Sequence, residues 1–405
     1  VSLPFVDPRS RCSLMTDRVS VLRTIRIFYP HVTGPANQAY WISKYLAEND
    51  VDSLVVTTHR QGFDAPAEQS MEGFHVRRID ESIGVMAYRH VVEPAPIVEA
   101  TPDLYHIHCY RDRLCSLAAD AATRRGIPFV VQPHGALAMY RHILDGWRQW
   151  PYRVFDRFRF TREVSAADRV VVATAQEAQE AIECGVDEAR VEIIPVGADP
   201  IDFGSRVAPG SKGSVRALFV GRISPNRNVE QILKALGKLR DQLESAGFQL
   251  DLVGPAESTS SVQDADSYLT MLKSLTERLG LTRFVSFRGP LFNQDLRNVY
   301  RNADLFLYTS RYENFGQTVL EAAACGCPVI ATPTGVASDL VEDDRTGYLV
   351  PHGDVDALAE RIRGVIDRPS RLTGFSNAIL AEVTQRYRWS TVAGMYSDLY
   401  RQMLH

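Results

Sequence analysis

The chain alternates short apolar runs with longer amphipathic stretches from residue 23 onward. The apolar runs have the length of strands, and the stretches between them have the spacing of helices that bury one face. Strands are predicted at 23–29, 52–57, 103–108, 128–132, 169–173 and 191–194, with helices at 36–48, 111–125 and 175–184. Strands that alternate with helices form a parallel sheet with helices on its faces.

A polar segment with several glycines and prolines, residues 197–214, separates this series from a second one, and its composition is that of an interdomain linker. The second series predicts strands at 215–220, 248–253, 284–288, 304–308, 328–331 and 347–350, again with helices between them. The pattern therefore predicts two doubly wound α/β domains, at 21–203 and 204–385. Two such domains face each other across a cleft, which is the usual place for a ligand.

The two ends of the chain fall outside these domains. Residues 386–405 are predicted to form a helix that returns toward the first domain. Residues 1–20 read as a polar leader without the basic-then-apolar order of a signal peptide, and Met15 within it suggests an alternative start or an expression remnant.

Composition narrows the classes of function. The 45 basic and 49 acidic residues leave a net charge of −4, so the chain as a whole lacks the excess of positive charge that is typical of nucleic-acid-binding proteins. No apolar run approaches the roughly 20 residues that a membrane-spanning helix needs. The six cysteines form no C-x-x-C pair and no disulfide framework, which favours a reduced, cytoplasmic setting.

The stretch SRYENFGQTVLEAAACGCPV, residues 310–329, places candidate chemistry between two predicted strands. Gly316 lets the backbone approach a ligand, and the free N–H groups at the helix start suit an anion. Glu321 is the one acid on an apolar helix, so it must face solvent or accept hydrogen bonds from hydroxyl groups, which a ribose could supply. Glu313 is anionic and suits neutral sugar hydroxyls or a developing positive charge better than phosphate.

A second strand-to-helix passage, GRISPNRNVEQILKAL at 221–236, carries two arginines. Gly221 permits a tight turn after the strand, and Arg222 and Arg227 flank the start of the next helix. Arginine forks match phosphate oxygens bidentately, so this pair suits an anionic ligand. The alternative is that both are solvated surface charges, as most arginines are.

These motifs together resemble a known family. The spacing E-N-F-G-x-x-x-x-E that ends at Glu321, preceded by G-R-x-x-x-x-R that ends at Arg227, resembles the retaining nucleotide-sugar glycosyltransferases of family four, the glycosyl transferases group 1. Four further motifs follow in family order: PDLYHIH (102–108), VVQPHGAL (130–137), VEIIPVGAD (191–199) and ATPTGVASDLVEDDRTGYLVPHGD (331–354). The resemblance covers most of the chain and implies the GT-B architecture, two Rossmann-like domains facing each other across an interdomain cleft.

The resemblance also implies roles for individual residues. It implies catalytic roles for Glu313, His134, Arg222 and Arg227, and donor binding by Gly34, Arg222, Arg227, Asn314, Phe315, Gly316 and Glu321. The arginines would neutralise the donor diphosphate, Glu321 would hold the ribose, and Glu313 and His134 would address the donor sugar. Two departures stand out. The family usually has lysine in place of Arg227, and it often has a second glycine and an acid where this chain has Pro35 and Asn37.

The implied reaction is retaining transfer of a hexose-type sugar from a nucleoside-diphosphate sugar, with UDP or GDP as the nucleotide. The acceptor would be a hydroxyl group on a glycan, a lipid-linked molecule or a small molecule. Fixed arginines and a helix start would stabilise the leaving diphosphate, and the acceptor would attack on the same face. The alternatives are a nucleotide-sugar epimerase of the same fold and a non-catalytic nucleotide-sugar-binding subunit.

No metal or other cofactor is expected. A DxD-like signature is absent from the sequence, and the clusters of histidine and cysteine that hold metals are absent as well. His106 and His108 alternate along a predicted strand and could suggest a metal pair, but no further ligands lie near them in the sequence.

Residues 141–162, RHILDGWRQWPYRVFDRFRFTR, interleave six arginines with six aromatic residues. One interpretation is a basic, aromatic surface that rests on anionic lipid, which would place the protein peripherally at the inner face of a membrane. The other is a helix pair of the first domain that buries its aromatic rings and solvates its arginines. A single-stranded nucleic-acid groove has a similar composition, but the net negative charge of the chain opposes it.

Overall fold

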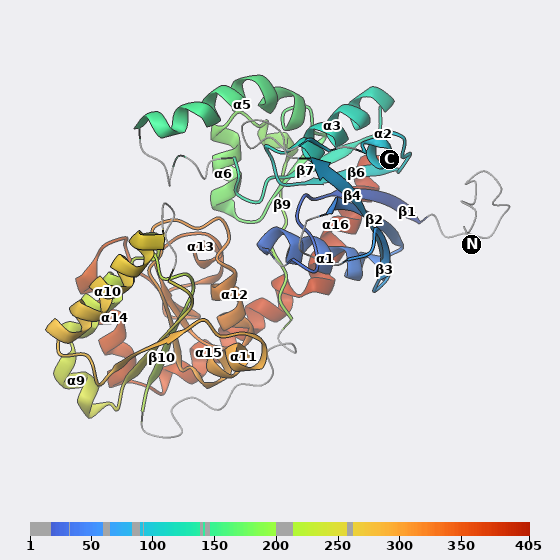
Figure 1. Ribbon diagram of the computed structural model, residues 1–405. Helices are drawn as coiled ribbons and strands as arrows, with labels where there is room; N and C mark the ends of the chain where they lie inside the picture. Colours follow the sequence, from blue (N-terminus) through green and yellow to red (C-terminus); the bar gives the residue numbers. More distant parts are fainter. Residues whose placement is uncertain are drawn as a thin grey trace.

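The computed structural model describes residues 18–31, 33–59, 65–82, 90–91, 93–137, 141, 146–199, 214–256 and 262–405. Figure 1 shows two α/β domains, one blue to green and one yellow to orange, with a red C-terminal helix that runs from the second to the first. Each domain is built on one mainly parallel sheet, which confirms the predicted fold class. Most of the predicted linker 197–214 and residues 1–17 of the predicted leader lie outside the described residues.

The first domain contains a nine-stranded sheet in the order β3-β4-β2-β1-β6-β7-β8-β9, with β5 paired to β4. Its strands are β1 (Val19–Thr24), β2 (Val51–His59), β3 (Glu68–Met71), β4 (Phe74–Ser82), β5 (His90–Val91), β6 (Leu104–His108), β7 (Phe129–Gln132), β8 (Arg169–Val172) and β9 (Val191–Ile193). Only β3 and β5 pair antiparallel among the described strands. The parallel centre places the carboxyl ends of β1, β6, β7 and β8 at one edge of the sheet.

The helices of this domain begin at residues that cap them. Its described helical segments are α1 (Gly34–Ala47), α2 (Ala95–Val98), α3 (Arg113–Arg125), η3 (Gly146–Gln149), α5 (Trp150–Glu163), α6 (Ala175–Glu183) and η4 (Glu188–Arg190).

Three of these helices have side-chain caps. Thr33, Asp112 and Thr174 precede α1, α3 and α6, and their side-chain oxygens accept from backbone N–H groups of the first turns. These caps satisfy donors that the first turn of a helix leaves open.

The first strand was predicted too late in the chain. It runs from Val19 to Thr24 rather than over 23–29, so the last residues of the predicted leader belong to the sheet. Ile25 and Phe28 follow it and are buried, but they pack in a separate small cluster with Phe74 and its neighbours. Burial without strand pairing produced the same apolar pattern as a strand. The strands β3 and β4 were missed because their exposed positions are polar or charged.

The second domain contains a parallel six-stranded sheet in the order β12-β11-β10-β13-β14-β15. Its strands are β10 (Arg216–Val220), β11 (Gln249–Val253), β12 (Val285–Gly289), β13 (Leu305–Tyr308), β14 (Val329–Ala331) and β15 (Gly347–Leu349). Its helical segments are η5 (Pro225–Arg227), α8 (Val229–Gly237), α9 (Arg240–Ser245), α10 (Val262–Arg278), α11 (Asn293–Asn302), α12 (Gln317–Ala324), α13 (Val336–Leu340) and α14 (Val355–Asp367). The strand order reverses between β10 and β13, and open α/β sheets bind ligands at such a switch point.

The chain ends with α15 (Arg371–Glu382), η6 (Val383–Tyr387) and α16 (Trp389–Leu404). α16 packs against α1 of the first domain, where Trp389 stacks on Trp41 and Arg401 donates to the carbonyl oxygen of Asn49. Near its end, Tyr400 is fully buried beside β1. Within the described part of the chain, none of the helices combines the length and apolar character needed to cross a membrane.

Candidate functional site

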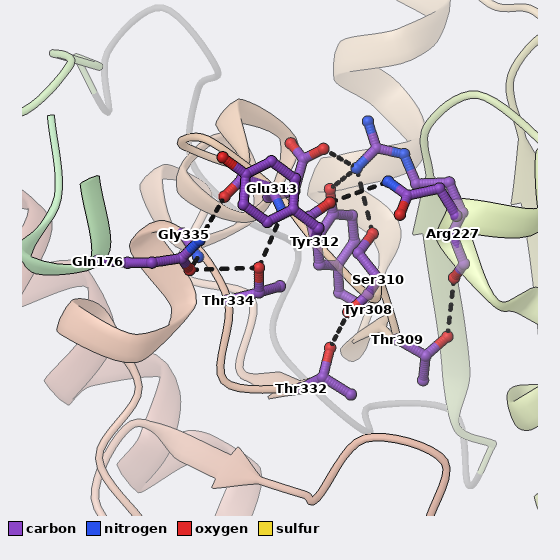
Figure 2. Close-up of polar contacts among 11 residues, drawn as sticks. Gln176, Arg227, Tyr308, Thr309, Ser310, Tyr312, Glu313, Thr332, Thr334 and Gly335 are labelled. Carbon is purple, nitrogen blue, oxygen red and sulfur yellow. Dashed lines mark hydrogen bonds and ion pairs between the residues drawn. The ribbon is translucent and has the colours of Figure 1, made fainter. Parts of the chain in front are cut away.

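The loop between β13 and α12 carries the Glu313–Gly316 motif and lies at the carboxyl edge of the second sheet (Figure 2). Gly316 has a φ of 86° and caps α12, a left-handed conformation that glycine adopts without steric cost. Gly335 approaches from the neighbouring loop, and a Cβ there would lie 2.4 Å from the carbonyl oxygen of Phe315. The N–H of Val336 donates to the same oxygen. The two loops therefore hold each other in place at the start of α12.

Glu313 forms an ion pair with Arg227 at the centre of this site (Figure 2). The same guanidinium nitrogen, Nη1, also donates to the hydroxyl groups of Tyr308 and Ser310. Burial alone would lower the pKa of Arg227, but the nearby Tyr308 and Glu313 groups outweigh it and raise the pKa. Because Arg227 follows β10 and Glu313 follows β13, the pair joins the two strands between which the sheet order reverses.

The remaining nitrogens of Arg227 have a different environment. All hydrogen bonds of the guanidinium to described residues come from Nη1, so Nε and Nη2 donate to none of these residues. In Figure 2 the second terminal nitrogen points away from the cluster. A guanidinium has five N–H donors, so this arrangement leaves one side of the fork for the oxygens of a ligand.

Glu321 lies on α12 and accepts a hydrogen bond of 2.8 Å from the hydroxyl group of Tyr300. Burial raises the pKa of Glu321 to about 7, although the hydrogen bonds from Tyr300 and Gln317 act in the opposite direction. The sequence required this acid to face solvent or to meet hydroxyl donors, and Tyr300 supplies one such donor. The ribose contact remains a prediction.

His134 follows β7 in the first domain and has a φ of 53°, a left-handed conformation that is rare for residues other than glycine. Its carbonyl oxygen accepts a hydrogen bond of 3.1 Å from Asn314 Nδ2 in the second domain. The next residue, Gly135, donates its N–H to the carboxylate of Glu177. A Cβ on Gly135 would overlap the side chain of Asn314. Strained backbone held from both sides is typical of functional sites.

The His134 imidazole is neutral at physiological pH. Burial lowers its pKa to about 3. Its Nε2 lies 3.0 Å from His108 Nδ1 on β6, and the two rings stack with centroids 5.3 Å apart. The ring is therefore fixed by its contact with a neighbouring strand.

Further contacts join the two domains around this loop. Gln176 at the start of α6 accepts from the N–H of Gly335 at 3.0 Å and lies 3.4 Å from the carbonyl oxygen of Glu313 (Figure 2). One helical turn later, Glu180 accepts from the hydroxyl group of Tyr312 at 2.9 Å. We call these contacts, with that between Asn314 and His134, the interdomain junction. It places the Glu313 loop beside the strand ends of the first domain.

The structure brings only some of the predicted residues into this cluster. The side-chain and backbone partners of Glu313 among the described residues are Arg227, Thr334 and Gln176. Arg222 is exposed beyond the end of β10 and does not bond to Glu313. Gly34 is the first residue of α1, and a Cβ there would meet nothing within 4 Å, so no close approach to described atoms requires glycine at this position.

Sequence reasoning missed the residues that support the site from the first domain, above all Gln176, Glu177 and Glu180. Glu177 is buried, and the pattern Thr174–Ala175–Gln176–Glu177 has the S/T-x-x-E spacing of a capping box, which agrees with the helix predicted at 175–184. In the structure the Glu177 carboxylate instead accepts from the N–H groups of Ala173 and Gly135. Its contact with the His134 loop has no signal in the sequence.

The two histidines considered as a metal pair contact a cation of the protein itself. Arg23 lies 2.8 Å from His106 Nδ1 and 3.4 Å from His108 Nε2, measured from its Nη1. A guanidinium between two imidazoles opposes binding of a second cation there. The described part of the chain contains no group of three or more His, Cys, Asp and Glu side chains arranged to hold a metal ion.

Two family models match consecutive parts of the chain. The model described as "Glycosyl transferase 4-like domain" matches residues 33–197, and the model described as "Glycosyl transferases group 1" matches residues 205–379. A D-inositol 3-phosphate glycosyltransferase of Streptomyces coelicolor is 30% identical over 98% of this chain and 94% of that protein. D-inositol 3-phosphate glycosyltransferase 2 of Catenulispora acidiphila is 33% identical over 60% of this chain, and the matched region spans only 57% of that relative.

Solved structures of similar proteins share the fold. The Anabaena Alr3699/HepE protein in complex with UDP and glucose superposes with a TM-score of 0.71 at 20% identity, over 95% of this chain and 100% of that one. The sucrose-phosphate synthase of Thermosynechococcus elongatus gives a TM-score of 0.71 at 21% identity, over 95% of this chain and 99% of that one. At these identities the likeness establishes the two-domain architecture.

Proposed function

Because this chain belongs to the group 1 glycosyltransferases and has their GT-B architecture, we propose that it transfers a hexose-type sugar from a nucleoside-diphosphate sugar to a hydroxyl acceptor, with retention of configuration. The observation that carries the proposal is the Arg227–Glu313 ion pair at the switch point of the second sheet. One side of the Arg227 fork holds Glu313 in place, and the other side offers donors to phosphate oxygens.

The leaving group of this reaction is a nucleoside diphosphate, which gains negative charge as the bond to the sugar breaks. Arg227, the start of α12 and the exposed Arg222 supply positive charge and N–H donors for it. Arg227 and the backbone at the start of α12 are held by their own contacts before the substrate binds, so these donors need little reorganisation in the transition state. No metal takes part in the proposed reaction.

The sugar ring is addressed from both domains in this proposal. Glu313 comes from the second domain and the neutral His134 from the first, and Asn314 connects their two loops. The acceptor hydroxyl attacks on the face from which the diphosphate departs, because the diphosphate oxygens there can receive the hydroxyl proton. The names of the relatives make D-inositol 3-phosphate the first acceptor to test. The structures of the Anabaena protein with UDP and with UDP-glucose make UDP-linked sugars the first donors to test.

A transfer assay tests the proposal directly. The full chain is incubated with UDP-glucose, UDP-N-acetylglucosamine or GDP-mannose and a panel of acceptors that includes D-inositol 3-phosphate, and NMR identifies the anomeric configuration of the product. We expect a new glycoside of the same configuration as the donor, with activity that survives chelation by EDTA. Isomerisation of the donor without an acceptor would instead support an epimerase, and an inverted product would contradict the retaining mechanism.

We also propose that the segment around the start of α5 contacts anionic lipid. Trp147 is 82% exposed and Trp150 is 66% exposed, so neither ring is buried as the packing interpretation of this segment requires. Arg148 and Arg153 are exposed beside them, and neither forms an ion pair with a residue that the structure describes. Tryptophan rings settle at the headgroup level of a bilayer, and unpaired arginines attract anionic headgroups. A lipid-linked acceptor would be presented at such a surface.

Vesicle co-sedimentation tests this surface. We expect the chain to sediment with phosphatidylglycerol-containing vesicles at low salt and to be released by added salt. It should not sediment with neutral vesicles. The double variant Trp147→Ser, Trp150→Ser should lose this binding. Phe292→Ser is the matched control, because Phe292 is 71% exposed on the second domain. Equal binding by both variants, or no binding of the native chain to anionic vesicles at low salt, would contradict the proposal.

A further inference from the structure

A fully buried arginine, which has no acidic partner among the described residues, lies inside the first domain. Arg23 on β1 is 0% exposed, and its partners are Ser53, His106, His108 and Tyr400, none of which carries a negative charge. Arginine stays protonated in proteins, and a buried charge is costly unless strong contacts compensate it. The partners of this buried cation are neutral, and each must direct a lone pair at it. This requirement determines which nitrogen of each histidine ring carries the hydrogen.

The register of the sheet determines which histidines Arg23 meets. Arg23 pairs with His106 across β1 and β6, and His108 pairs with Gln132 across β6 and β7. His106 and His108 stack with ring centroids 4.2 Å apart and an interplanar angle of 9°. Arg23 Nη1 reaches both rings, at 2.8 Å from His106 Nδ1 and 3.4 Å from His108 Nε2.

Arginine can only donate, so both of these ring nitrogens must be acceptors. In a neutral imidazole the hydrogen then resides on the other nitrogen. His106 carries its hydrogen on Nε2, which lies 3.2 Å from Gln132 Oε1, an acceptor. His108 carries its hydrogen on Nδ1, which lies 3.0 Å from His134 Nε2. Each assignment finds the acceptor that it requires, so the network is internally consistent.

The position of the hydrogen on His108 also determines the position of the hydrogen on His134 in the candidate site. His134 Nε2 accepts the hydrogen of His108, so the hydrogen of a neutral His134 resides on Nδ1. His134 is half-buried, and its Nδ1 makes no hydrogen bond to any residue that the structure describes. Nδ1 is therefore the ring nitrogen that can meet a ligand, and it meets that ligand as a donor.

We propose that Arg23 and His108 are positioning residues that fix His134 in its Nδ1–H tautomer, so that the site presents an N–H donor to an oxygen atom of its ligand. Without Arg23, nothing in the His108–His134 pair defines the direction of the hydrogen bond, because each ring can donate or accept. A reversed pair would place a lone pair where the ligand oxygen needs a donor. The identification of the ligand as a sugar rests on the proposed function. The assignment of the His134 tautomer does not depend on that function.

The charge states in the network agree with this direction. Burial is the largest cause that lowers the pKa of His106 and His108 well below the ordinary value, and the positive charge of Arg23 adds to it. His134 is neutral for the same reason of burial. The other groups that face the network are Tyr396 and Tyr400 of α16, and burial raises the pKa of both phenols. Neutral rings and phenols leave Arg23 as the one fixed donor among these contacts.

Nitrogen NMR of the full chain with ¹⁵N-labelled histidine tests the proposal. Long-range ¹H–¹⁵N spectra distinguish a nitrogen that carries hydrogen from one that does not, and the loss of signals in His134→Asn assigns His134. We expect His134 in the native chain at pH 7 to have hydrogen on Nδ1 and a bare Nε2. A bare Nδ1 or a doubly protonated ring in the native chain would overturn the proposal, whatever the variants do.

The variants separate positioning from packing. Arg23→Met and His108→Phe should each give His134 a mixture of tautomers, seen as Nδ1 and Nε2 shifts that move toward each other. Tyr400→Phe is the matched control, because it removes a partner of Arg23 but leaves the path through His108 intact, so its His134 spectrum should match the native one. A folded Arg23→Met or His108→Phe variant with the native His134 spectrum would also overturn the proposal.

An activity measurement then connects the tautomer to the proposed function. Arg23→Met should lower kcat with UDP-glucose by roughly two- to tenfold, the worth of one hydrogen bond, while UDP affinity stays unchanged. The two failures are distinguishable. If no UDP-sugar is used as a donor, the proposed function fails, while the NMR result still decides the tautomer.

Discussion

Arg227 combines two tasks in one side chain, and this gives the first prediction at the scale of single residues. Arg227→Ala removes a donor to phosphate and also the partner of Glu313. We expect UDP binding to weaken by about 1.5–3 kcal/mol, the worth of a charge-assisted contact. Arg222→Ala should weaken it as well. Calorimetric titration with UDP measures both, and the exposed Arg283→Ala serves as control.

Unchanged UDP affinity in both variants would remove the phosphate assignment. Arg227→Lys keeps the charge and should retain much of the activity, since the family resemblance implies lysine at this position. Complete loss of activity in Arg227→Lys would show that the fork is required because it holds Glu313 and the phosphate at once.

Substitution of Glu313 and substitution of Glu321 should impair different properties of the protein. Glu313→Gln keeps the size and removes the charge near the sugar, so turnover should fall far more than UDP affinity. Glu321→Gln should weaken UDP and UDP-sugar alike, because the ribose is common to both. Titration with UDP followed by transfer at saturating donor measures the division. Loss of UDP affinity in Glu313→Gln with normal binding in Glu321→Gln would show that the two roles are exchanged.

At the scale of elements, the contact between the β7–His134 loop and the Glu313 loop gives a further prediction. Gly135 has a φ of 76°, and a Cβ there would lie 1.8 Å from the Asn314 side chain. Gly135→Ala should therefore destabilise the protein by at least about 1–2 kcal/mol and displace Asn314 from His134. Urea unfolding and a transfer assay measure the two effects.

Gly364→Ala is the matched control for this substitution. Gly364 lies inside α14, and a Cβ there would meet nothing within 4 Å. Alanine favours a helix interior over glycine, so this variant should be neutral or more stable by about 0.5–1 kcal/mol. If Gly135→Ala behaves like Gly364→Ala, the two loops do not constrain each other.

At the scale of the whole molecule, buried acids make stability depend on pH. Burial raises the pKa of Glu177 from 4.5 to about 7, although its two backbone hydrogen bonds act against the shift. Between these values the folded chain binds a proton that the unfolded chain has lost. The stability that Glu177 contributes is therefore fully present below pH 4.5 and is lost as the pH rises through about 7.

The buried histidines act in the opposite direction. His106, His108 and His134 have lowered pKa values, so the stability that they contribute is present above pH 6.5 and is lost as the pH falls below it. A comparison of the native chain with Glu177→Gln cancels this histidine contribution. The free energy of unfolding of the native chain, relative to the variant, should be higher at pH 5 than at pH 8 by on the order of 2–3 kcal/mol.

Urea unfolding of both proteins at pH 5, 6, 7 and 8 measures this difference. Glu188→Gln on the exposed η4 is the control, and its difference from the native chain should stay flat. If the stability difference between the native chain and Glu177→Gln also stays constant with pH, the pKa of Glu177 is the same in the folded and unfolded chain. Its two N–H donors would then stabilise the carboxylate to the same degree as water does.

The division into two parallel-sheet α/β domains followed from periodicity. Strand-length apolar runs alternating with amphipathic stretches predicted two parallel-sheet domains, because a strand buried on both faces and a helix buried on one leave different local patterns. The exceptions have local causes as well. Ile25 and Phe28 extended the first predicted strand because they are buried in a loop, and β4 was missed because its FHVRRIDES sequence lacks an apolar run.

The sequence by itself also determined which chemical groups are available: Glu313, Arg227 and His134 follow predicted strands, and Glu321 lies on the helix after Glu313. Only the tertiary structure decided which of them meet. Arg227 and Glu313 lie 86 positions apart, and Arg23 and Tyr400 lie 377 apart. Hydrophobic periodicity records the surroundings of each residue along its own element, whereas a polar contact depends on the register between strands and on the packing of one domain against the other. The partner of Glu313 and the tautomer of His134 depend on these distant contacts, and the sequence pattern carries no trace of them.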